Sequence, residues 1–87
     1  MAHSHAHGPA DADVLAALRT SILGALPNAQ LEVSGGGGHY TLVVTSAAFA
    51  GKGMVDSQRL VYGAIAHLMR GDDAPVHAID SLRTRTP

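Results

Sequence analysis

The chain has 87 residues and contains no cysteine and no tryptophan. Without cysteine it cannot form a disulfide, and it cannot hold a zinc finger or an iron–sulfur cluster on thiolates of its own. Aromatic side chains are also scarce, since there are only two tyrosines and one phenylalanine. The core must therefore be built mainly from Leu, Val, Ile and Ala.

Strong charge and long apolar runs are missing too. The formal net charge is -1, so the chain lacks the excess of basic residues that usually marks nucleic-acid binders. No apolar run approaches the ~20 residues of a membrane span, and the first residues lack the pattern of a secretory signal. The sequence predicts a cytoplasmic protein with no membrane partner.

Residues 1–10 differ in composition from the rest and are predicted to form a histidine-containing, flexible tail. His3, His5 and His7 alternate along this segment, a pattern that can bind nickel, copper or zinc but also occurs in plain tails and tags. Residues 11–87 are long enough for one small domain. The folded domain is therefore expected to begin near Asp11.

The sequence pattern of the first half of this domain predicts a helix followed by a β-hairpin. Asp11 or Asp13 is a candidate helix cap, and the apolar residues that follow recur at helical spacing as far as Pro27: Leu15, Leu18, Ile22 and Leu26. Alternating residues then predict two strands, over 30–34 and 40–45. The four glycines between them, 35–38, exceed the needs of a tight turn, so we expect a mobile loop or a close backbone approach by a partner.

The second half reads as a corner, a helix and a strand. Residues 46–53 form the corner, Asp56 is the predicted cap of a second helix with a Val55–Leu60 staple, and Gly71 can end that helix. A third strand is predicted from Val76 to about Asp80. The order helix, strand, strand, helix, strand indicates an α+β fold with both helices on one face of the sheet.

Few residues are candidates for catalysis or for metal binding. No phosphate-binding loop, nucleophile elbow or carboxylate pair is recognisable, so the sequence does not predict an enzyme. His39 beside the glycines and His77 at the third strand are the best candidate metal ligands, because neutral imidazole is a good ligand. The alternative is that His77 is a half-buried strand residue and His39 an ordinary loop residue.

Four sequence blocks together resemble the BolA-like family: His39-Tyr40 through Val44, Ser46 through Lys52, Arg59-Leu60-Val61-Tyr62, and Val76-His77-Ala78-Ile79. The resemblance covers about residues 13–87. It implies a class II KH-like fold with a mixed three-stranded sheet packed by helices. It also implies a non-enzymatic iron–sulfur adaptor, which pairs with a monothiol glutaredoxin and shares a [2Fe-2S] cluster with that protein and glutathione. By this likeness His77 is the principal cluster ligand, and His39 is the histidine available for the loop ligand.

The chain departs from the family pattern at three places, one of which is that the sequence stops where the family often continues with an acidic segment containing tryptophan. The stretch Ser57-Gln58-Arg59 replaces a more basic helix start, and one additional residue after His77 suggests a bulge or an altered strand end. An alternative function remains a KH-like nucleic-acid-binding transcriptional regulator, with DNA contacts from Lys52, Arg59, Arg83 and Arg85. A third interpretation is a homodimeric structural module that buries its sheet face or a helix surface.

Overall fold

The computed structural model describes residues 10–87, so the predicted histidine-containing tail lies outside the described residues except for Ala10. The helices are α1 (Asp11–Ala25) and α2 (Met54–Ile65), with short 3-10 turns at η1 (Ala47–Phe49) and η2 (Ala66–Leu68). The strands are β1 (Gln30–Gly36), β2 (His39–Thr45) and β3 (Ala78–Arg85). The predicted α+β order of helix, strand, strand, helix, strand is confirmed.

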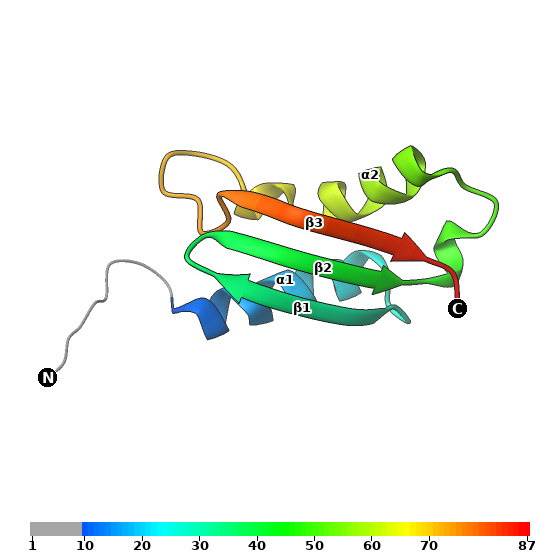
Figure 1. The fold of residues 1–87 in the computed structure, drawn as a ribbon, viewed down its shortest axis with the longest axis horizontal. Helices are drawn as coiled ribbons and strands as arrows, with labels where there is room; N and C mark the ends of the chain where they lie inside the picture. Colours follow the sequence, from blue (N-terminus) through cyan, green and yellow to red (C-terminus); the bar gives the residue numbers. More distant parts are fainter. Residues whose placement is uncertain (1–9) are drawn as a thin grey trace, which may run out of the picture.

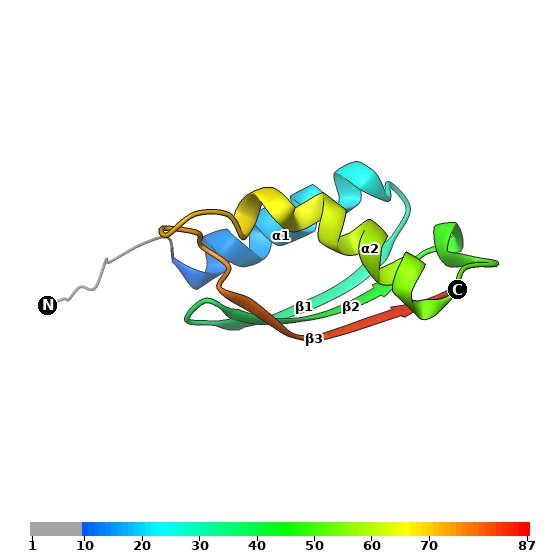
Figure 2. The same ribbon diagram turned by 90° about the horizontal axis from the view of Figure 1, so that it is seen from above.

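The three strands form one mixed sheet in the order β1-β2-β3. The β1–β2 pair is antiparallel and the β2–β3 pair is parallel, as Figure 1 shows. Turned by a quarter, the molecule has α1 and α2 on the same side of the sheet (Figure 2). The other face carries no helix in this part of the chain, which matches the class II KH-like arrangement expected from the sequence.

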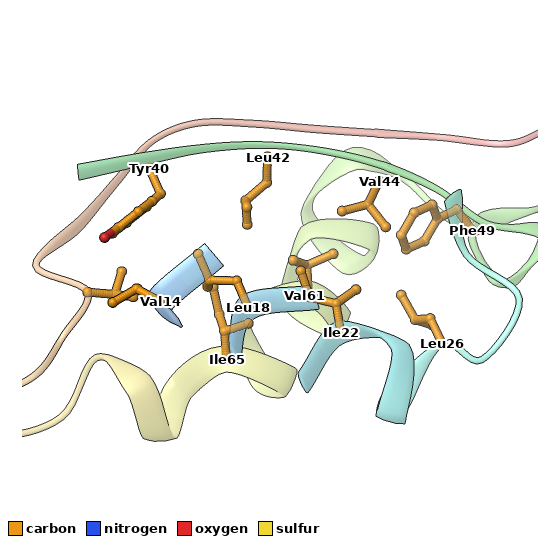
Figure 3. Packing of buried hydrophobic residues seen from close by; sticks show 11 residues of the cluster. Val14, Leu18, Ile22, Leu26, Tyr40, Leu42, Val44, Phe49, Val61 and Ile65 are labelled. Carbon is orange, nitrogen blue, oxygen red and sulfur yellow. The ribbon is translucent and has the colours of Figure 1, made fainter. Parts of the chain in front are cut away.

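The core lies between the sheet and the two helices (Figure 3). Central strand β2 contributes Tyr40, Leu42 and Val44, each no more than 1% exposed. They pack on residues of α1, α2 and the 3-10 turn η1: Val14, Leu18, Ile22, Phe49, Val61 and Ile65. The strict alternation of β2 explains this burial, because successive strand side chains point to opposite faces.

Both predicted helix caps are wrong. Helix α1 begins after Ala10, and α2 begins after Gly53, with no side-chain cap in either case. Asp56 therefore lies inside the first turn of α2, where a carboxylate still favours the positive end of the helix dipole. The Val55–Leu60 staple is also wrong, since Val55 is 62% exposed. At its other end α2 gives way to η2, and Gly71 adopts a positive φ of 84° only after that turn.

Strand β3 starts two residues later and ends five residues later than the predicted Val76 to about Asp80. The predicted bulge is confirmed: Ile79 pairs with Tyr40 and Ser81 with Thr41, which leaves Asp80 as an additional residue. This residue changes the parity of the strand, so that Ile79 and Leu82 both face the helices although they are three positions apart. The alternation of inward and outward side chains is therefore interrupted at Asp80, which is where the sequence pattern predicted the end of the strand.

The glycine loop is tighter than predicted. Gly35 and Gly36 belong to β1, and only Gly37 and Gly38 form the turn. Their φ values are +62° and +87°, which fits the two-residue turns that match the twist of a hairpin. The predicted mobile loop is thus a short turn that fixes the register of β1 and β2. Among residues 10–87, no helix combines the length and apolar character needed to cross a membrane.

Candidate functional site

The β1–β2 turn and the start of β3 lie side by side at one end of the sheet (Figure 1). Two backbone hydrogen bonds join them: the amides of His77 and Ala78 both donate to the Gly38 carbonyl oxygen, at 2.8 and 3.0 Å. His39 is the Cα partner of Ala78 in the β2–β3 ladder. The fold therefore brings the backbones of His39 and His77, the two predicted ligands, within one ladder step of each other.

His77 immediately precedes β3 and is exposed, whereas the preceding Val76 is fully buried. Its ring lies directly over Gly38. A Cβ atom built on Gly38 would stand 2.7 Å from Nδ1 and 2.8 Å from Cγ of His77, closer than atoms can pack without moving. Glycine at position 38 thus does two things: it accepts the positive φ of the turn, and it leaves room for the imidazole.

His39 is the first residue of β2 and is exposed. Its neighbour Tyr40 points into the core, so His39 points to the face of the sheet that carries no helix. His39 Nδ1 lies 3.0 Å from Asp80 Oδ1, and the two side chains are 56% and 57% exposed. Asp80 was not predicted as a site residue, because its contact with His39 depends on how β2 and β3 pair.

The turn is anchored by Asp11, the first residue of α1. Its carboxylate accepts a hydrogen bond from the Gly37 amide at 3.1 Å, and its negative charge acts on the Tyr40 side chain. Burial raises the pKa of Tyr40, and the negative charge of Asp11 adds to the rise. Tyr40 lies at one end of the core in Figure 3. Asp11, predicted as a helix cap, instead ties α1 to the turn that carries His39.

The described residues do not complete a metal site alone. Residues 10–87 contain no group of three or more His, Cys, Asp or Glu side chains that could hold a metal ion. What they offer at this end of the sheet is two imidazoles on an exposed surface. Such a donor set suits a metal group whose remaining ligands come from another molecule, and it does not suit a metal group held by residues 10–87 alone.

The arginines predicted for DNA contact lie elsewhere. Arg83 and Arg85 are on the C-terminal half of β3, at the opposite end of the strand from Ala78. They line a groove of about 280 Å³ together with Met54, Gln58, Leu82 and Thr84. Gln58 Nε2 donates to the Leu82 carbonyl at 3.2 Å and so joins α2 to β3 within the lining of this groove.

The other two predicted DNA contacts do not join this pair. Lys52 and Arg59 are not among the residues that line the groove. Arg59 Nη1 lies 3.7 Å from Asp56 Oδ1 within the first turns of α2. The structure therefore gathers two of the four predicted cations at one groove, and it separates that groove from the histidines.

The comparisons with known proteins agree on one family. A family model described as BolA-like protein matches residues 2–87. The solution structure of BolA1 from Mus musculus is 31% identical, with 100% of this chain and 76% of that chain covered and a TM-score of 0.73. A bol-like protein from Babesia bovis is 30% identical over 84% of each chain, with a TM-score of 0.71.

A bolA protein homologue from Coxiella burnetii is 32% identical, with 80% of this chain and 86% of that chain covered and a TM-score of 0.67. No curated protein sequence matches the chain significantly.

Proposed function

This chain belongs to the BolA-like family, and from that membership we propose that it is a non-enzymatic iron–sulfur adaptor. In this proposal it binds a monothiol glutaredoxin and contributes His77 and His39 to a [2Fe-2S] cluster that the two proteins share with glutathione. One observation carries the proposal: the fold places both histidines at the same exposed end of the sheet, with backbone hydrogen bonds between their segments.

The number and type of donors support a shared cluster. A [2Fe-2S] cluster is usually held by four thiolates, and two histidines replace two of them in Rieske centres. This chain has no cysteine, so any thiolates must come from the glutaredoxin and from glutathione. Its own contribution is then two neutral imidazole nitrogens, the same number that a Rieske centre uses.

In this proposal two further residues support the positions of the histidines. Gly38 leaves space for the His77 ring, and Asp11 holds the turn through the Gly37 amide. The cluster, when bound, supplies iron–sulfur chemistry for trafficking or iron sensing. Because imidazole can take up a proton whereas a bound thiolate resists it, histidine ligands favour a cluster that is released readily.

A titration tests the proposal. We expect increasing amounts of this protein, added to a cluster-bearing monothiol glutaredoxin, to produce new visible absorption and circular dichroism bands that saturate at a fixed ratio. New bands are expected because the exchange of thiolate for imidazole changes the charge-transfer transitions of the iron. Apo-glutaredoxin with the same protein serves as the blank. If the cluster spectrum stays the same throughout the titration, the adaptor function is wrong.

A second candidate function is nucleic-acid binding, and the groove beside Arg83 and Arg85 favours it. If DNA binds there, its affinity should fall steeply as salt rises, because each neutralised phosphate releases counterions. Replacing both arginines by alanine should weaken binding to all sequences and reduce the slope of log affinity against log salt by about 2. Fluorescence anisotropy with a labelled duplex measures both quantities.

Arg70→Ala is the control for this experiment, because Arg70 is exposed and does not line the groove. An Arg83→Ala/Arg85→Ala protein with the affinity and salt slope of the wild type would contradict a DNA site at this groove. The net charge of -1 favours the adaptor function over this one.

A further inference from the structure

Strand β3 contains a bulge beside His39, and the additional residue is Asp80. The ladder runs from the His39–Ala78 and Tyr40–Ile79 pairs directly to Thr41–Ser81, so Asp80 has no partner on β2. Bulges in parallel pairs are rare, and bulges often redirect a side chain next to a functional site. In this chain the redirected side chain is a carboxylate.

The bulge changes what Asp80 can reach. In a regular ladder Asp80 would pair with Thr41, two residues along β2 from His39 and about 6.6 Å further along the strand. In the structure Ser81 takes that pairing position, and Asp80 Oδ1 lies 3.0 Å from His39 Nδ1. The contact between the two side chains therefore forms across the bulge.

This contact selects one form of the imidazole. An ionised carboxylate only accepts hydrogen bonds, so His39 Nδ1 must carry the proton. In neutral imidazole the second nitrogen, Nε2, then has its lone pair available. Metal-binding histidines generally show this arrangement, in which the other ring nitrogen donates to a carboxylate or a carbonyl and the ring orientation is fixed.

We infer that Asp80 is a positioning residue, which holds His39 in the Nδ1–H form so that Nε2 is the ligating nitrogen. The identity of the metal group rests on the proposed function, whereas the selection of the tautomer does not. Folding stability does not account for the pair, because both side chains are more than half exposed and such pairs contribute little to stability.

The first experiment needs no cluster. Long-range nitrogen–proton NMR spectra of the apo-protein, labelled with heavy nitrogen, report the tautomer of each histidine at a pH above the imidazole titration range. We expect His39 to be protonated on Nδ1 in the wild type, and to shift toward the Nε2–H form in Asp80→Ala. Asp56→Ala is the matched control, because Asp56 is an exposed aspartate on α2 paired with Arg59. An identical His39 tautomer in wild type and Asp80→Ala would overturn the inference.

The second experiment measures cluster sharing. Loss of such an outer partner typically lowers metal affinity by about 10- to 100-fold, so Asp80→Ala should require at least about tenfold more protein for half-saturation in the glutaredoxin titration. His39→Ala keeps the principal ligand His77 and should still take a weaker share of the cluster, and in that background Asp80→Ala should have no further effect, because Asp80 acts through His39. A tenfold loss that persists without His39 would overturn the positioning role.

The two measurements separate the two claims. If wild-type protein takes no share of the cluster but the tautomer depends on Asp80, the adaptor function fails and the selection of the tautomer by Asp80 stands. If the tautomer depends on Asp80 but cluster affinity does not, the adaptor function stands and the positioning role for the cluster is overturned.

Discussion

The His77→Ala protein is expected to fold like the wild type and to lose the new visible bands in the glutaredoxin titration. His77 is exposed and precedes β3, so removal of its ring should change the free energy of unfolding by only about 0.5 kcal/mol. The ligand role is different, because no cysteine is available as a replacement donor. We therefore expect the half-saturation concentration to rise beyond the measurable range.

His67→Ala is the matched control for this variant. His67 is also exposed, but it lies in η2 and its Nε2 is 3.2 Å from Ser21 Oγ on α1. Its removal should leave the spectral titration unchanged, while far-ultraviolet circular dichroism verifies the fold of both variants. Equal titration curves for His77→Ala and wild type would exclude His77 as a ligand. A loss of bands in His67→Ala as well would point to a general effect of histidine removal.

The Gly35→Ala protein is expected to be about 4 kcal/mol less stable than the wild type, as the sum of backbone strain and overpacking. Gly35 has a φ of +120°, a region that is essentially restricted to glycine. An added Cβ would also overlap the His39 carbonyl oxygen and stand 2.8 Å from the Cα of Tyr40. These are backbone atoms of the paired strand, so the clash is relieved only by a shift of the hairpin itself.

Gly37→Ala provides the comparison within the same turn. Gly37 has a φ of +62°, and an added Cβ would meet nothing within 4 Å. Only the left-handed backbone then opposes the substitution, at a cost of about 1 kcal/mol. Urea unfolding followed by circular dichroism measures both variants. Similar midpoints for Gly35→Ala and Gly37→Ala would contradict the close approach of Gly35 to β2.

The central strand shows how much local pattern can predict. Tyr40, Leu42 and Val44 alternate with less buried residues in the sequence, and the structure buries all three against the helices. The alternation is reliable here because β2 is paired on both sides, without a bulge on β2 itself. The order of the elements and the α+β class followed from patterns of this kind.

The ends of the helices and strands were harder to predict, because they depend on tertiary contacts that the local spacing of residues does not report. Asp11 resembles a cap because it precedes a helical pattern, yet its carboxylate binds the amide of Gly37, 26 residues away. Strand β3 appeared to end at Asp80 because the bulge reverses the alternation beyond that point. Both errors arise from tertiary pairing, which a single sequence reports only indirectly.

The candidate site was predictable in part. His39 and His77 were singled out from their residue type, their place near strands and the family resemblance, and the structure places their backbones at one end of the sheet. The role of Asp80 was not predictable from its position in the sequence, because its contact with His39 needs the register of β2 and β3. The additional residue after His77 was the one signal, and it indicated a bulge without showing which side chain the bulge would redirect.

The most direct test of the central claim is pulsed electron paramagnetic resonance of the reduced, shared cluster. Only this protein is prepared with heavy-nitrogen histidine, so any strong coupling to that isotope identifies an imidazole of this chain as an iron ligand. We expect strong coupling in the wild-type complex, and no coupling in a mixture prepared with His77→Ala, because that variant takes no share of the cluster. A complex that contains the cluster but shows no such coupling would contradict the account, because the cluster would then be held without histidine from this chain.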